Sequence, residues 1–175
     1  MNPKIEILPK VKEVLRAEAD AINAVKIDSS YEEAINILFE SSGKIITTGM
    51  GKAGFVAQKF AAIMSSTGTS SVFIHPAEAA HGDLGVISKN DSIVAFSTSG
   101  KTREVLEFIE LSRHMTNGSV IGITSHSDSG LRELSDVIID MGVIREPCPL
   151  GMTPTASMAV MAAVSDAIAL VLMQK

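Results

Sequence analysis

The sequence predicts an α/β fold, a three-layer α/β/α sandwich around a five-stranded parallel sheet. Short apolar or β-branched runs, each as long as a buried strand, recur along the chain. Helical patterns follow them after short connections, and such alternation is typical of parallel sheets. The 175 residues can bury one substantial core, and they contain no internal repeat, low-complexity tract or linker. We therefore expect a single domain over residues 1–175.

The N-terminal segment, residues 3–27, is predicted to be a helix. Glu18 interrupts its apolar stripe, and Pro9 could mark the start of the regular part. Such a helix could pack on its own domain or on a neighbouring subunit, and the sequence leaves both open. A second helix is expected over residues 31–41, capped by Ser29-Ser30. The stripe has apolar residues at spacings built from threes and fours, namely Ile7, Val11, Val14, Leu15, Ile22 and Val25.

The remaining elements alternate. The predicted strands cover residues 44–48, 71–74, 93–96, 119–124 and 136–140. Helices are predicted over residues 55–66, 101–109 and 153–173, with a helical turn at 131–134, while residues 76–85 are expected to be irregular. The last helix is apolar nearly all round, which is typical of a helix buried in the core or in an oligomer contact.

Composition excludes several classes of function. The net charge is −5 and no cluster of Lys or Arg stands out, which argues against nucleic acid as a partner. No apolar run is long enough to span a bilayer, and the N-terminus lacks a signal-peptide core, so we expect no membrane association. Cys148 is the only cysteine, which excludes a disulfide framework and favours a cytoplasmic location.

A turn crowded with hydroxyl groups follows the central strand. Its sequence is STSGKT at residues 97–102, hereafter the hydroxyl turn, and it leads directly into a helix. A helix start offers unpaired N–H groups and the positive end of the dipole, and Ser and Thr add further donors. A Ser/Thr helix cap would explain any single hydroxyl equally well. Four hydroxyls and Gly100 in six residues favour an anion site for a phosphate monoester.

A second glycine-rich turn, GMGKAG at residues 49–54, matches the letters of a dinucleotide fingerprint. That fingerprint needs an acidic residue at the end of the next strand, where His75 stands instead. A nicotinamide cofactor is therefore disfavoured, and neither turn is a complete Walker A loop. Lys52 lies at a helix start, where its charge opposes the dipole, which favours a functional role over a merely solvated lysine.

These turns should meet in space. Ligands bind such sheets at the carboxyl ends of the strands. Several candidate segments follow predicted strands and should therefore lie at this edge. They are the two glycine-containing turns, the glycine-flanked connection with His81, and the Arg145–Glu146 pair. A lone histidine is often structural, but its place in a connection makes a functional role equally reasonable for His81.

Together these motifs resemble the sugar isomerase (SIS) domain family, and within it the arabinose-5-phosphate isomerases. The resemblance covers nearly the whole chain, and HGDLG at residues 81–85 is its specific part. The stretches that carry it are GMGKAG at residues 49–54, HPAEAAHGDLG at 75–85, STSGKT at 97–102, REPCP at 145–149 and TPTAS at 153–157.

The resemblance implies a flavodoxin-like SIS fold and interconversion of D-ribulose 5-phosphate and D-arabinose 5-phosphate for Kdo synthesis. Kdo is a sugar of lipopolysaccharide and of some capsules. The resemblance also implies no organic cofactor and a homotetramer whose sites are shared between subunits. The matching substrate-binding positions are Ser97, Ser99, Thr102, Gly68, Thr69 and His81. The positions tied to catalysis are Glu104, His81, Lys52 and Glu146, while His75 matches a site for inhibitory zinc.

The sequence departs from many relatives in two ways. It has no CBS modules after the SIS domain, so it resembles the short form. Relatives also continue into a segment with a further catalytic histidine, which nothing here matches, so either the chain is truncated or its catalytic set differs.

The implied isomerisation needs a base that removes a proton from carbon. It also needs a group that stabilises the developing oxyanion and a group that transfers hydroxyl protons. Glu104 or Glu146 is expected to be the base. Each also has a simpler explanation: the helix dipole favours a glutamate such as Glu104 in a first turn, and Glu146 could form an ion pair with Arg145, which would lower its pKa. Lys52 could stabilise the enediolate, and His81 could open the sugar ring. A 3-hexulose-6-phosphate isomerase and a non-catalytic sugar-phosphate sensor remain alternatives, with HGDLG arguing against the first. A purely structural role would leave the hydroxyl turn unexplained.

Overall fold

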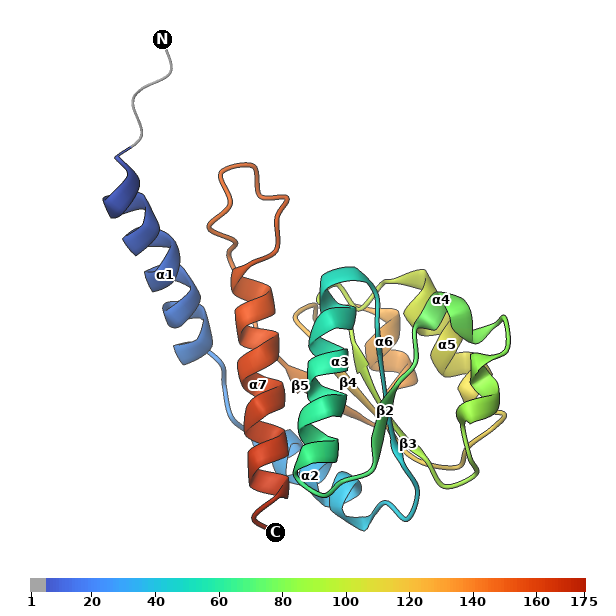
Figure 1. The fold of residues 1–175 in the computed structure, drawn as a ribbon. Coiled ribbons are helices and arrows are strands. Elements are labelled where there is room, and N and C mark those ends of the chain that lie inside the picture. The colour runs from blue at the N-terminus through green and yellow to red at the C-terminus, as the bar shows by residue number, and fades with distance from the viewer. Residues whose placement is uncertain (1–5) are drawn as a thin grey trace.

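A computed structural model describes residues 6–175, and it contains the predicted five-stranded parallel sheet (Figure 1). The strands lie in the order β2-β1-β3-β4-β5, and every neighbouring pair is parallel. The order reverses between β1 and β3, so a crevice opens there at the carboxyl ends of the strands. The strands are β1 Ile45–Gly49, β2 Ser71–Phe73, β3 Ser92–Phe96, β4 Val120–Thr124 and β5 Val137–Asp140.

Two helical layers cover the sheet and confirm the three-layer sandwich. Helices α2 (Ser29–Glu40), α3 (Gly51–Ser66) and α7 (Ala156–Leu172) form one apolar core with one face of the sheet. Helices α4 (Pro76–Ala79), α5 (Arg103–Ser112) and α6 (Gly130–Leu134) form a second core with the other face. None of the helices within residues 6–175 is long and apolar enough to cross a membrane.

Helix α1 (Ile7–Asn23) contacts α7 but buries none of its own residues. It stands beside the upper half of α7, away from the sheet (Figure 1). The helix begins two residues before Pro9 and ends at Asn23, so the predicted end at residue 27 was wrong, and residues 3–5 lie outside the described residues. The α2 cap was also wrong, because the Asp28 carboxylate, not Ser29-Ser30, accepts the N–H of Ser30 at 2.9 Å.

Helix α3 begins at Gly51, four residues before its predicted start, and the glycine motif explains why. A Cβ atom on Gly54 would lie 2.5 Å from the carbonyl oxygen of Gly49. The glycine thus lets α3 pack directly against the end of β1, so here the motif serves close helix–strand packing. The segment expected to be irregular contains α4 and a short 3-10 helix, Asp83–Val86.

The amino-terminal edge of the sheet is held by Asp91, which is fully buried. Its two carboxylate oxygens accept the backbone N–H groups of Lys44 and Ser88, each at 2.7 Å. The ammonium group of Lys44 lies 2.8 Å from the same carboxylate. Asp91 therefore joins the segments that lead into β1 and β3, the two strands on either side of the crevice.

Removing this carboxylate should destabilise the fold. We expect Asp91→Ala to lower the free energy of unfolding by about 3 kcal/mol, because it removes a buried carboxylate together with its ion pair and leaves two part-buried N–H groups without an acceptor. Urea denaturation followed by circular dichroism measures this loss. Asp128→Ala is the matched control, since that side chain is 98% exposed, and it should unfold like the wild type. Equal stabilities of the two variants would contradict the role given to Asp91.

Candidate active site

The hydroxyl turn and Lys52 line one cavity of about 260 Å³ at the carboxyl ends of β1 and β3. This edge of the sheet lies at the top of Figure 1, where α3 and α7 begin. The cavity thus sits in the crevice expected from the strand order. We call it the turn cavity. It is lined by Met50, Lys52, Ala53, Phe96, Ser97, Thr98, Ser99, Thr102, Pro154 and Met158.

The hydroxyl turn is folded tightly around Gly100. The Gly100 N–H donates to the carbonyl oxygen and to the hydroxyl of Ser97, both at 3.1 Å. Gly100 has a φ of +61°, and a Cβ there would lie 2.3 Å from Ser129 Oγ. Both the positive φ and the lack of space require glycine at this position.

The hydroxyls of the turn do not cap the helix that follows. Thr102 is the N-cap residue of α5, yet its side chain makes no capping hydrogen bond. Its hydroxyl instead lies 2.9 Å from the hydroxyl of Ser97, while Ser99 Oγ accepts the N–H of Lys101 at 3.2 Å. The alternative of a simple Ser/Thr cap is therefore disfavoured, and the positive end of α5 remains available to an anion.

A second cavity, hereafter the loop cavity, adjoins the first and has a volume of about 500 Å³. Thr98 and Pro154 line both cavities, so a ligand on the hydroxyl turn can extend into either. Glu146, half-buried in the loop after β5, lines the loop cavity. His126, which our sequence analysis missed, lines it too. Its position directly after β4, at the same edge of the sheet, was the available signal.

Glu146 acts as a cap for α7 rather than as a partner of Arg145. Its carboxylate accepts the N–H groups of Thr155, Ala156 and Ser157 at 2.8, 2.9 and 3.1 Å. Burial raises the pKa of Glu146, but the nearby Ser157 hydroxyl and the hydrogen bonds from these three N–H groups outweigh it and hold the pKa below its usual value. A carboxylate so stabilised is a weak base.

The other predicted residues are spread around the carboxyl-end edge. Glu104 is half-buried in the first turn of α5 and lines neither of these two cavities. His81 is exposed just after α4, while His75 begins α4 and its Nδ1 is buried without a partner among the described residues. Within residues 6–175 no group of three or more His, Cys, Asp or Glu side chains could hold a metal ion, so one chain gives His75 no set of co-ligands.

Gly68 and Thr69 lie far from the hydroxyl turn within the chain. They form the connection between the end of α3 and the start of β2, which is the amino-terminal edge of the sheet. The structure therefore does not bring this pair together with the other predicted site residues of the same chain.

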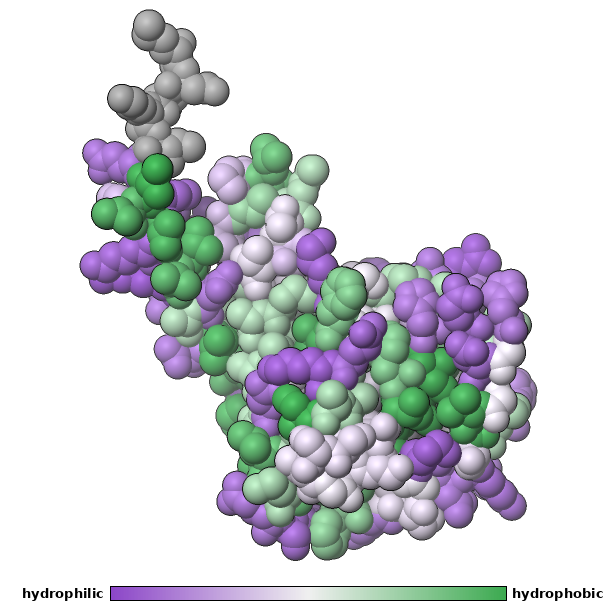
Figure 2. All heavy atoms as spheres, viewed as in Figure 1, coloured by the Kyte–Doolittle hydropathy of each residue, from purple (hydrophilic) through white to green (hydrophobic). Residues whose placement is uncertain are grey.

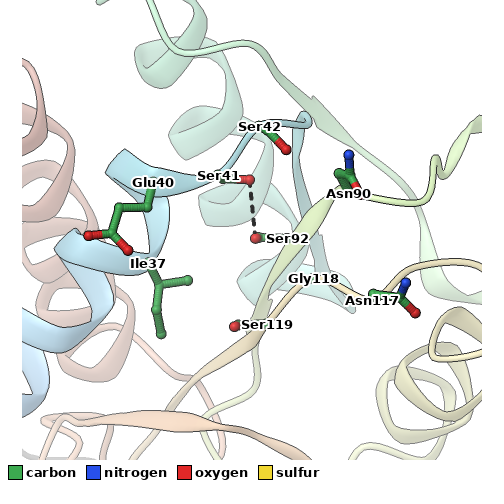
Figure 3. A pocket seen from close by; sticks show the side chains of 9 residues that line it. All are labelled: Ile37, Glu40, Ser41, Ser42, Asn90, Ser92, Asn117, Gly118 and Ser119. Atoms are coloured by element: carbon green, nitrogen blue, oxygen red, sulfur yellow. Dashed lines mark hydrogen bonds between the residues drawn. The ribbon is translucent and has the colours of Figure 1, made fainter.

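A further cavity, of about 290 Å³, occurs at that opposite edge (Figure 3). Ser41 from the end of α2 and Ser92 from the start of β3 lie with their hydroxyls 3.2 Å apart in it. Its lining contains no Lys, Arg or His, and Glu40 is its one charged residue. A phosphate ester is therefore better suited to the turn cavity.

Comparison with known proteins identifies the family. Residues 37–171 match the model of the SIS domain. The chain belongs to the SIS domain family. Arabinose 5-phosphate isomerase KdsD of Pseudomonas aeruginosa is 35% identical to it over 99% of this chain and 54% of the relative. KpsF of Escherichia coli, also an arabinose 5-phosphate isomerase, is 34% identical over 97% of this chain and 52% of the relative.

Solved SIS structures agree with the fold. A phosphosugar isomerase involved in capsule formation from Bacteroides fragilis is 40% identical, with a TM-score of 0.93 over 96% of this chain and 90% of the other. Escherichia coli CFT073 c3406 in complex with arabinose 5-phosphate is 34% identical, with a TM-score of 0.92 over 99% of this chain and 93% of the other. The chain spans about half the length of the curated relatives it matches, and the short form without CBS modules stays a prediction.

Removing the Glu146 carboxylate from this SIS domain should cost stability in a pH-dependent way. We expect Glu146→Ala to lower the free energy of unfolding by about 1–2 kcal/mol at pH 7, as loss of a helix cap does. Folding lowers the pKa of Glu146, so the ionised carboxylate stabilises the fold above the unfolded value of about 4.3. This contribution is lost as the pH falls through the lower folded value.

Urea denaturation of both proteins between pH 3 and 7 measures this effect. The difference in the free energy of unfolding between the wild type and Glu146→Ala should be largest at pH 7 and should shrink toward pH 3. Wild-type stability combined with a large loss of turnover would instead place Glu146 in the chemistry rather than in the cap.

Proposed function

We propose that this chain is an isomerase that interconverts D-ribulose 5-phosphate and D-arabinose 5-phosphate through an enediol. The observation that carries this proposal is the uncapped hydroxyl turn at the start of α5, which opens into a cavity that Lys52 also lines. The names of the relatives and the arabinose 5-phosphate complex of a 34% identical structure support the choice of substrate.

In this mechanism the phosphate is held by hydroxyls and N–H groups. Ser97, Ser99 and Thr102 donate to its oxygens, and the dipole of α5 favours its negative charge. Such an anchor fixes the distance from the phosphate to the reacting carbons, which lowers the entropic cost of reaction. Lys52 offers a cation to the oxygen that gains negative charge in the enediolate.

Glu104 is the better candidate for the base that moves the carbon-bound proton. Glu146 is committed to three N–H groups of α7, whereas Glu104 lies in the first turn of the helix that binds the phosphate. His81 is assigned ring opening of the cyclic sugar. No redox equivalent enters or leaves, because the sugar carbons exchange oxidation states with each other, so the reaction requires no organic cofactor.

Two alternative functions, a different sugar-phosphate isomerase and a sugar-phosphate sensor, can be distinguished from this one. A 3-hexulose-6-phosphate isomerase has the same fold, but a structure from Methanococcus jannaschii to which that function was attributed is only 19% identical and shows the fold alone. A sugar-phosphate sensor would keep the hydroxyl turn without needing Lys52 and Glu104. A panel of ketose phosphates distinguishes the first alternative, and binding without turnover identifies the second.

The assembly we propose is a homotetramer in the cytoplasm that supplies a precursor of Kdo. Apolar side chains gather on the outer face of α1, above the sheet domain in Figure 2. Ile7, Leu8 and Leu15 are 72%, 81% and 62% exposed there, which is a patch suited to burial between subunits. Gly68 and Thr69 lie at the opposite edge from the hydroxyl turn of their own chain, so the substrate contact that the resemblance implies for them requires a site shared with another subunit.

Turnover of ribulose 5-phosphate tests the proposed activity. Wild-type protein incubated with ribulose 5-phosphate in D2O should form arabinose 5-phosphate carrying deuterium at C2, detected by NMR, because an enediol exchanges its carbon-bound proton. Glu104→Gln should reduce kcat by at least about 100-fold, as loss of a general base does. Glu110→Gln, exposed on the same helix, is the control and should retain wild-type kcat. Full activity of Glu104→Gln would exclude Glu104 as the base.

The size of the protein in solution tests the proposed assembly. Sedimentation velocity should show a tetramer for the wild type, and Leu8→Lys combined with Leu15→Lys should produce smaller species by placing charge in the α1 contact. If sites are shared, turnover should fall with dissociation while the circular dichroism spectrum stays unchanged. The control is Lys12→Glu, on the same helix outside its apolar stripe. A wild-type monomer would contradict the proposed assembly.

A further inference from the structure

We propose that His126 is a further catalytic residue, which carries the hydroxyl protons of a substrate anchored on the hydroxyl turn. This inference rests on the proposed isomerase function. It starts from the contact between the two segments, because the ring Nδ1 of His126 lies 3.0 Å from the carbonyl oxygen of Thr98. The imidazole is therefore held against the turn that binds the phosphate.

The position of His126 is fixed from several sides. Its carbonyl oxygen accepts a hydrogen bond from the Nε–H of Arg132 at 2.6 Å. The guanidinium group of Arg132 also donates to the carboxylate of Asp140 in β5 at 2.5 Å. Its N–H points toward Thr124 Oγ1, 3.5 Å away at the end of β4. These contacts hold the backbone of His126, and the contact with Thr98 orients its ring, which is otherwise exposed. The imidazole thus has a defined position at the edge of the loop cavity.

The contact with Thr98 also fixes the tautomer of the ring. A carbonyl oxygen can only accept hydrogen bonds, so Nδ1 carries a hydrogen whether the ring is neutral or charged. Nε2 is then the nitrogen that gains and loses a proton. A neutral ring can accept a proton at Nε2 and a charged ring can donate one, and imidazole makes this change between pH 5 and 8.

The loop cavity gives this nitrogen a place to act. His126 and Glu146 both line the cavity, but the Glu146 carboxylate is occupied by the N–H groups of α7. Ser125, which lines it too, has a buried hydroxyl without a protein partner among the described residues. An unsatisfied buried hydroxyl is typical of a site that receives a polar ligand. His126 is thus the group of this cavity best placed to exchange protons.

The charged groups around His126 come from separate elements. Arg132 of α6 binds its carbonyl oxygen, and Glu146 of the loop after β5 shares its cavity. Asp128 follows two residues later and lies 3.7 Å from the ammonium group of Lys101, beside the hydroxyl turn. Groups of both signs therefore face this part of the loop cavity, on α6, on the loop after β4 and on the loop after β5.

Glu104 removes a proton from C1 of ribulose 5-phosphate while the His126 imidazolium gives its Nε2 proton to O2, which forms the enediol. Neutral His126 then takes the proton from O1 as the C1 carbonyl forms, and Glu104 returns a proton to C2. One C–H and one O–H bond break, one of each forms, and both residues regain their initial state.

His126→Asn is the sharpest variant, because its side-chain amide can still donate to Thr98 but has no counterpart of Nε2. We expect kcat to fall about 100-fold or more, KM to stay within about threefold, and the dependence of kcat on pH between 5 and 8 to flatten. His126→Gly should regain part of its activity when imidazole is added. His114→Asn, an exposed histidine at the end of α5, is the control and should behave as wild type.

The outcomes separate the two proposals. A wild-type protein that forms no arabinose 5-phosphate refutes the isomerase function and with it the role of His126. An active wild type with an equally active His126→Asn variant refutes the role of His126 alone. A raised KM with an unchanged pH profile and no imidazole rescue would show that His126 only supports the turn, which also overturns the proposal.

Discussion

The site depends on one electrostatic constraint, the uncompensated positive end of α5 at the crevice between β1 and β3. The strand order opens the crevice, and the tight turn around Gly100 brings α5 to its edge with no side chain capping it. N–H groups left without partners at a helix start are costly unless water or an anion satisfies them. A phosphate bound here would satisfy these groups, which supports the proposed position of the substrate phosphate.

The loop after β5 brings a second constraint to the same edge. Glu146 neutralises the start of α7 in the way that a phosphate would neutralise the start of α5. Two helix starts thus meet at the cavities, one satisfied by the protein and one open to a ligand. This difference separates the two glutamates. Glu146 lines the loop cavity and is bound to three N–H groups of α7, whereas Glu104 lies in the first turn of α5 without such bonds.

Much of this arrangement could be predicted from the sequence. Alternating apolar runs and helical patterns predicted the sheet, and the sequence of the hydroxyl turn predicted a polar turn at a helix start, because both signals are local. The anion site at this turn stays a prediction. Glu146 was harder, since its binding to α7 joins residues nine to eleven positions apart across an irregular loop. His126 was missed because a lone histidine in a polar loop has no pattern, and only the contact with Thr98 distinguishes it. The predicted role of Gly68 and Thr69 also has no local signal, because within one chain the two residues lie at the amino-terminal edge of the sheet, opposite the hydroxyl turn.

The sheet also brings the two proposed proton-transfer groups to the same edge. β3 and β4 are neighbours in parallel register, so the turn after β3 and the loop after β4 end side by side. Glu104 follows the first and His126 lies on the second, which places a carboxylate and an imidazole on separate segments around one phosphate anchor. A carboxylate suits the carbon-bound proton, and an imidazole suits the hydroxyl protons, since it changes charge near neutral pH. Adjacent strands of one parallel sheet can therefore supply both kinds of proton transfer without a metal ion or an organic cofactor in the proposed reaction.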